Sequence, residues 1–148
     1  MRIEPVSDKT LELKEKMSKI FSENGIDNGI EVKYKSFAYT IKDDEENILG
    51  GIFGRKLYDE IHISELCLNK SIRGQGFGRK LLEIVEKEVD DGACEFVDLN
   101  TTSFQNAVEF YKKCGFEVEF VRKHKNNSRF DKYYMVKKLR DGSISHDY

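Results

Sequence analysis

The stretch "SIRGQGFGRKLLEIVE" (residues 71–86) places Gly74, Gly76 and Gly78 directly before a helical pattern of apolar residues. Ordering a glycine costs more backbone entropy than ordering any other residue, so glycines at spacing two indicate a tight bend or a close approach to another group. The start of a helix carries unpaired N–H groups and partial positive charge, which favour an anion. The stretch therefore predicts an anion-binding turn that leads into a helix.

Length and charge limit the classes of function. A chain of 148 residues without a linker-like stretch predicts a single domain over residues 1–148, with a loose tail from residue 140. A net charge of −2 and a pI near 6.0 give no general attraction to nucleic acid or to a membrane. No signal peptide or apolar span is visible, which favours a cytoplasmic location.

The chain has three cysteines, Cys67, Cys94 and Cys114, in apolar surroundings and without metal-ligand spacing. We expect buried, reduced thiols and no metal.

Hydrophobic periodicity predicts the order helix, three strands, helix, strand, helix, two strands. The first helix covers residues 8–24 after a cap at Ser7 or Asp8, and Gly92 and Gly115 close the second and third helices. Ser103 is the expected cap of the third helix. The remaining expected segments are strands near 37–41, 48–57, 61–68, 94–100, 116–121 and 129–139 and a helix over 77–90. Crossover helices after a meander make a mixed sheet, so the fold class is α/β or α+β.

Three kinds of phosphate-binding loop compete for the glycine stretch. The P-loop is rejected because no hydroxyl follows Lys80 and the glycine spacing is wrong. The dinucleotide fingerprint fits poorly because "NKSIR" separates the strand from the first glycine. The third alternative is a turn whose N–H groups point at a pyrophosphate, with positive charge from Arg73, Arg79 and Lys80. This turn contains Arg73, Gly74, Gln75, Gly76, Phe77 and Gly78.

Two motifs carry a family resemblance. "RGQGFG" followed by a Leu-Leu pair resembles the acetyl-CoA signature of the GCN5-related N-acetyltransferases, and "NAVEFYKKCGFEVE" (residues 106–119) resembles their later motif. The resemblance covers roughly residues 30–139, and small bacterial acetyltransferases of unassigned substrate are most similar. It implies a GNAT-type mixed, mostly antiparallel sheet flanked by helices, with a splayed strand pair that holds acyl-CoA.

The resemblance also implies cofactor-binding residues. The pantetheine arm would pair with backbone groups of Leu66, Cys67 and Leu68, and one of these N–H groups would stabilise the oxyanion. The side chain of Cys67 is then structural rather than a nucleophile. Asn106 would bond the pantetheine or phosphate region, although helix capping also explains an asparagine there.

Proton transfer has one candidate acid and several candidate bases. Tyr111 matches the tyrosine of the family's Phe-Tyr pair and would protonate the departing thiolate, although a core tyrosine is the alternative. His62 and Glu65 are the candidate bases, and a bulge in their strand would aim Glu65 at the site. Deprotonation through water alone is the third alternative.

The resemblance implies direct transfer of an acetyl group from acetyl-CoA to a primary amine of a small molecule or peptide, in a ternary complex. A non-catalytic acyl-CoA sensor and a nucleotide-binding module are the alternatives, and Tyr111 argues against the sensor. Asp59, Glu60 and Asp131 could hold a cationic amine, but solvated turns explain them too. Dimers are common in the family, but no sequence feature shows a homodimer here, and longer acyl groups stay open.

Overall fold

The computed structural model describes residue 2, residues 10–31 and residues 34–140. It divides into two compact units, Met1–Tyr34 and Lys35–Tyr148. The first unit contains helix α1, Thr10–Asp27, which runs three residues beyond the predicted end at residue 24. The helix continues through Gly25, and the left-handed position belongs to Gly29, with φ of 75°. The proposed caps Ser7 and Asp8 lie outside the described residues, and the single domain stays a prediction.

The second unit is built around a six-stranded sheet with the strand order β1-β2-β3-β4-β6-β5. The β2–β3, β4–β6 and β5–β6 pairs are antiparallel, and the β3–β4 pair is parallel. This mixed sheet with helices confirms the predicted fold class. Its strands are β1 (Tyr34–Lys42), β2 (Ile48–Leu57), β3 (Glu60–Leu68), β4 (Phe96–Thr102), β5 (Glu117–Arg122) and β6 (Lys132–Lys138). The helices of this unit are α2 (Phe77–Val89) and α3 (Val108–Lys113), with short 3-10 turns η1 (Lys70–Ile72), η2 (Ser103–Gln105) and η3 (Ser128–Phe130).

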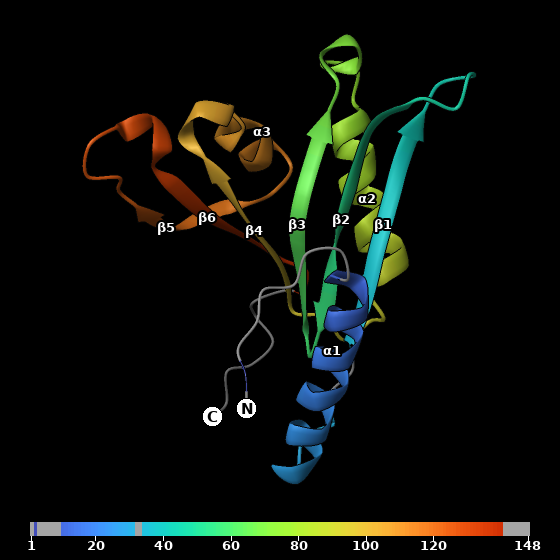
Figure 1. The fold of residues 1–148 in the computed structure, drawn as a ribbon. Helices are drawn as coiled ribbons and strands as arrows, with labels where there is room; N and C mark the ends of the chain where they lie inside the picture. The colour runs from blue at the N-terminus through green and yellow to red at the C-terminus, as the bar shows by residue number, and fades with distance from the viewer. Residues whose placement is uncertain (1, 3–9, 32–33, 141–148) are drawn as a thin grey trace. The chain divides into compact units, whose positions relative to one another are not determined.

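Helix α2 covers one face of β2 and β3 and forms the core with them (Figure 1). Its buried stripe of Leu81, Leu82, Val85 and Val89 follows helical spacing. The stripe packs in one cluster with sheet residues that include Ile52 and Ile61. Burying each such side chain contributes roughly 1.5–3 kcal/mol, so this contact holds the turn before α2 firmly against the end of β3.

Strands β3 and β4 separate after a short parallel contact (Figure 1). Pairing joins Glu60–His62 to Phe96–Asp98 and stops there, although β3 continues to Leu68 and β4 to Thr102. The splayed strand pair implied by the family resemblance is therefore present. It leaves the second half of β3 without a strand partner on its β4 side.

A β-bulge interrupts β3 at Ser64. Phe53 pairs with Glu65 while its neighbour Gly54 pairs with Ile63, so Ser64 is an extra residue. The extra residue reverses the alternation of side chains along the strand. Ile61 and Ile63 face the core before the bulge, and Leu66 contacts the core after it.

The predicted third helix was wrong at its start. Ser103 lies inside η2 rather than capping α3, and Thr102 is the cap of η2, in a reciprocal capping arrangement with Gln105. Asn106 follows in the left-handed conformation, with φ of 53°, and so interrupts the helical backbone between η2 and α3. The helix therefore begins only at Val108.

The end of the described chain also differs from the prediction. Arg140 was expected to begin a loose tail, but its guanidinium donates to both carboxylate oxygens of Asp90, at 2.8 and 2.9 Å, and to the carbonyl of Gly92. The final strand also begins later than residue 129, because Ser128–Phe130 form η3. Residues 141–148 lie outside the described residues.

Candidate active site

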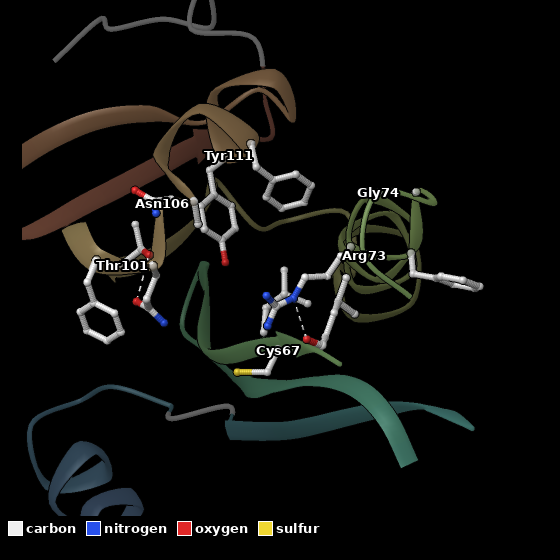
Figure 2. Close-up of a pocket in the computed structure, with 15 residues that line it drawn as sticks. Cys67, Arg73, Gly74, Thr101, Asn106 and Tyr111 are labelled. Atoms are coloured by element: carbon white, nitrogen blue, oxygen red, sulfur yellow. Dashed lines mark hydrogen bonds between the residues drawn. The ribbon is translucent and has the colours of Figure 1, made fainter. Parts of the chain in front are cut away.

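A cavity of ≈ 690 Å³ opens between the separated strands (Figure 2). Its walls come from the end of β3, the glycine turn, the end of β4 with η2, and α3. The lining residues are Leu66, Cys67, Leu68, Arg73, Gly74, Gly76, Phe77, Gly78, Thr101, Phe104, Gln105, Asn106, Ala107, Phe110 and Tyr111. Both motifs that carry the family resemblance therefore meet in one cavity.

The glycine turn combines two physical requirements. Gly74 and Gly76 have φ angles of 74° and 85°, and Gly76 is the cap of α2 without a side-chain hydrogen bond. The first N–H groups of α2 are thus available to an anion at the positive end of the helix. At Gly78, a Cβ atom would lie 2.9 Å from Cζ of Phe110, so the glycine permits contact between α2 and α3.

Gln75 of the expected pyrophosphate turn and Arg79 next to the turn do not line this cavity. Gln75 donates from Nε2 to the carbonyl of Ser71 at 3.3 Å. Arg79 donates to the carbonyl of Lys113 at 3.1 Å, and so ties α2 to the last turn of α3. Arg73 does line the cavity, and its Nε donates to the carbonyl of Leu68 at 3.1 Å. The structure thus gives Arg79 a link between helices and leaves Arg73 beside the cavity.

The strand end from Leu66 to Leu68 forms one wall of the cavity. It pairs with Gly50–Ile52 on one side only, because β4 has already separated. Alternate backbone groups of such an edge point away from the paired strand. The carbonyl of Leu68 accepts from Arg73, and the remaining groups are available to a ligand with amide groups, or to an oxyanion.

Tyr111 projects from α3 into the cavity (Figure 2). Its side chain is only 7% exposed, and its ring packs against Phe110 and Phe116. Burial, with smaller effects of Cys67 and Cys114, raises the pKa of Tyr111 to about 12. No other described residue hydrogen-bonds its hydroxyl. The phenol therefore stays protonated at neutral pH and is free to donate to a group in the cavity.

Several lining residues were not anticipated from the sequence. Most of them lie in η2 or close to it in the chain. Gln105 Oε1 accepts from the N–H of Thr102 at 2.8 Å and from Thr101 Oγ1 at 3.1 Å. These bonds fold the chain back after β4 and place Asn106 at the cavity wall. The missed residues are Thr101, Phe104, Gln105, Ala107 and Phe110; the pattern T-x-x-Q over residues 102–105 was the available signal.

The two candidate bases lie on the same face of β3 but in different surroundings. His62 Nδ1 lies 3.2 and 3.3 Å from the carboxylate oxygens of Asp98, where β3 and β4 still pair, and it does not line the cavity. Glu65 accepts from the thiol of Cys67 at 3.3 Å. Glu65 does not line the cavity either, but it bonds Cys67, which does, so Glu65 lies next to the cavity through that contact.

The expectation of three buried thiols was wrong for Cys67. Cys94 and Cys114 are buried, whereas Cys67 is exposed. The bulge in β3 turns its side chain to the face opposite α2. Burial, and then the hydrogen bond to Glu65, raise the pKa of the Cys67 thiol. A raised pKa disfavours the thiolate, in keeping with a structural role for this side chain.

Three carboxylates outside the cavity already have cationic partners: Arg140 for Asp90, Lys56 for Asp91 and Lys123 for Asp131. Asp90, Asp91 and Cys94 bring potential metal-ligating atoms within 4.8 Å of one another. Asp90 binds Arg140, and Asp91 binds Lys56 at 2.6 Å. Asp131, a candidate for holding an amine, is buried and accepts from the N–H of His124 at 2.7 Å. These carboxylates stabilise the fold.

The described part of the chain contains no helix that is long and apolar enough to cross a membrane.

Comparisons with known proteins agree with this geometry. The family model described as "Acetyltransferase (GNAT) domain" matches residues 5–137. Acetyltransferase Atu2258 of Agrobacterium fabrum (strain C58 / ATCC 33970) is 29% identical over 77 residues, which make up 52% of this chain and 56% of that protein. The chain thus aligns with only about half of that curated relative.

Solved structures share the fold. An acetyltransferase from Bacillus cereus ATCC 14579 is 24% identical, with a TM-score of 0.69 over 94% of this chain and 98% of that chain. A candidate streptothricin acetyltransferase from Bacillus anthracis str. Ames, solved in complex with acetyl coenzyme A, is 22% identical, with a TM-score of 0.62. That alignment covers 76% of this chain and 68% of the other.

Proposed function

Because this chain belongs to the GNAT acetyltransferase family, we propose that it transfers the acetyl group of acetyl-CoA directly to a primary amine of a small molecule or peptide. The observation that carries the proposal is the cavity between β3 and β4. It joins an anion-binding helix start, an open strand edge and the protonated hydroxyl of Tyr111. An acyl-CoA has a pyrophosphate, an amide-bearing arm and a thioester in the same order.

The proposed binding mode follows from these three features. The pyrophosphate lies on the N–H groups at the start of α2, with Arg73 beside it. The pantetheine arm lies along Leu66–Leu68 in place of the missing strand partner, with Asn106 on the opposite wall. The acetyl-CoA complex of the Bacillus anthracis protein supports this choice of co-substrate.

In the proposed reaction, the neutral amine nitrogen attacks the thioester carbonyl carbon and forms a C–N bond. An N–H group of Leu66–Leu68 stabilises the oxyanion. The C–S bond then breaks, and Tyr111 gives its proton to the departing sulfur. The amine loses its extra proton to a base, so the products are an amide and CoA thiol.

Glu65 is our candidate for the base or for the group that first receives the ammonium. It lies beside the cavity through Cys67, whereas His62 is held by Asp98 outside it. If water alone accepted the proton of the amine, the pH–rate profiles of Glu65→Gln and of the wild type would coincide. A change in the Glu65→Gln profile together with an unchanged His62→Ala profile would support Glu65.

Calorimetric titration with acetyl-CoA, followed by thiol release in the presence of a panel of primary amines, tests the function. We expect binding and amine-dependent release. Binding without release from any amine would favour the non-catalytic sensor, and absence of binding would contradict both. A cytoplasmic location stays a prediction.

Replacing Tyr111 by Phe tests the proton donor. We expect kcat to fall roughly 10²-fold, which is typical for loss of a positioned acid, and the Kd of acetyl-CoA to stay the same. Tyr134→Phe is the control, because Tyr134 packs against Phe120 on β5 rather than lining the cavity. A near-wild-type rate for Tyr111→Phe would remove this residue from the mechanism.

A further inference from the structure

A second hollow lies on β1, β2 and β3. It adjoins the cavity between β3 and β4, which we call the coenzyme cavity because the proposed function places acetyl-CoA there. It has a volume of ≈ 500 Å³ and shares two residues with the first cavity, Cys67 and Leu68. The other lining residues are Ala38, Tyr39, Thr40, Ile48, Leu49, Gly50, Gly51, Ile52, Phe53, Glu65 and Asn69. We call this hollow the β1–β3 groove.

The bulge at Ser64 determines which side chains face the groove. Ile52 and Leu66 pair across β2 and β3 and belong to the core. By alternation, the pairs Phe53–Glu65 and Gly51–Cys67 then lie on the opposite face. Without the extra residue, Glu65 would point toward the core instead.

The groove has apolar walls and one carboxylate. Phe53 is 48% exposed and lines the groove together with Gly50 and Gly51. Among the described residues that line the groove, Glu65 is the only acidic side chain. Its Oε1 lies 3.3 Å from Sγ of Cys67, which lines both cavities. An ammonium group on Glu65 would therefore lie next to the coenzyme cavity, with its substituent over Phe53.

We propose that the β1–β3 groove binds the acceptor of the reaction, and that this acceptor is a primary monoamine with an apolar aryl or alkyl substituent. The inference rests on the proposed function and specifies its substrate class. Glu65 complements the single positive charge, and Phe53 contacts the apolar group. A second ammonium would lose water in the groove without a second carboxylate to pair with, so diamines are disfavoured.

The test compares kcat/KM for 2-phenylethylamine, 1,4-diaminobutane and ethylamine at saturating acetyl-CoA. We expect the wild type to prefer 2-phenylethylamine over 1,4-diaminobutane by at least about 10-fold, which corresponds to roughly 1.4 kcal/mol. Phe53→Ala should lower kcat/KM for 2-phenylethylamine about 10-fold, mainly through KM, and leave the value for ethylamine within about twofold. Phe120→Ala is the matched control, because Phe120 is 54% exposed on β5 and does not line the groove.

Direct titration of 2-phenylethylamine into the CoA-saturated protein gives the same comparison without turnover. Equal binding by the Phe53→Ala and Phe120→Ala variants would overturn the proposal, as would a preference for the diamine. A large loss of stability in Phe53→Ala with unchanged amine preference would mean that another part of the chain occupies the groove, which also overturns it. Phe53→Leu, a milder change, repeats the comparison if Phe53→Ala fails to fold. Absence of thiol release with every amine would contradict the proposed function, whereas release with unaltered preference contradicts only the groove.

Discussion

Gly76 is the residue whose backbone conformation begins α2 at the proposed anion site. Its φ of 85° belongs to the left-handed region, and a Cβ there would meet nothing within 4 Å. Its requirement is therefore conformational, whereas that of Gly78 is steric, since Phe110 occupies the space of a side chain. Glycines that look alike in the sequence thus have different functions.

A substitution at Gly76 separates conformational strain from packing. We expect Gly76→Ala to lower the free energy of unfolding by about 1 kcal/mol, because an L-residue in the left-handed region is strained. Gly76→Asn should cost less, since asparagine tolerates this region. Urea denaturation of both variants measures the difference, and equal stability of Gly76→Ala and wild type would contradict the interpretation.

The raised pKa of Tyr111 predicts a loss of stability in alkali. Burial raises this pKa to about 12 from 10.0, so the folded state holds the proton more tightly than the unfolded state. Its contribution is complete below pH 10 and is lost as pH rises toward 12, with a slope of up to about 1.4 kcal/mol per pH unit. Between pH 9 and pH 11, the free energy of unfolding should therefore fall less steeply with pH for Tyr111→Phe than for the wild type. Parallel curves would show that the phenol titrates normally.

The 3-10 turn η2 is the element that sets the far wall of the cavity. Gln105 holds it by accepting from Thr102 N–H and from the hydroxyl of Thr101, which is 4% exposed. The turn places Asn106 on the cavity wall and sets the start of α3, the helix that carries Tyr111. Its hydrogen bonds therefore shape the proposed active site as well as the fold.

Gln105→Ala removes the shared acceptor of η2. We expect the free energy of unfolding to fall by about 1–3 kcal/mol, because the buried hydroxyl of Thr101 loses its partner. Binding of acetyl-CoA should weaken with it. Gln105→Glu keeps an acceptor oxygen and should retain more of the stability, which thermal denaturation would measure. If both variants were equally stable, the hydrogen bonds of Gln105 would not be what holds the turn.

At the scale of the sheet-forming unit, the end of the final strand is tied back to the end of α2. Arg140 binds both carboxylate oxygens of Asp90, 50 positions away in the chain. Burial opposes ionisation of Asp90, but the N–H of Gly92 and the guanidinium of Arg140 outweigh it and lower its pKa. This contact lies away from the coenzyme cavity.

Arg140→Ala should therefore affect stability and not cofactor binding. We expect a loss of about 1 kcal/mol at pH 7, because the pair is only partly buried. A carboxylate whose pKa is lowered in the folded state stabilises the fold at pH values above its unfolded pKa of 3.8. This stabilisation is lost as the pH falls through the folded pKa. The difference between variant and wild type should shrink below about pH 4. A weaker Kd for acetyl-CoA in Arg140→Ala would contradict a purely structural role.

Sequence patterns that extend over a few residues suffice to predict the order of helices and strands and the glycine turn. Helical and strand periodicity predict the order of elements, and the glycine run with the helix after it predicts an anion site, because both depend on local backbone geometry. The positions of Glu65 and Cys67 depend instead on the bulge at Ser64, which arises only when β3 pairs with β2. Tyr111 and the glycine turn likewise line one cavity only because β3 and β4 separate. Such features follow from strand register and helix packing between distant segments, so only the tertiary structure decides them.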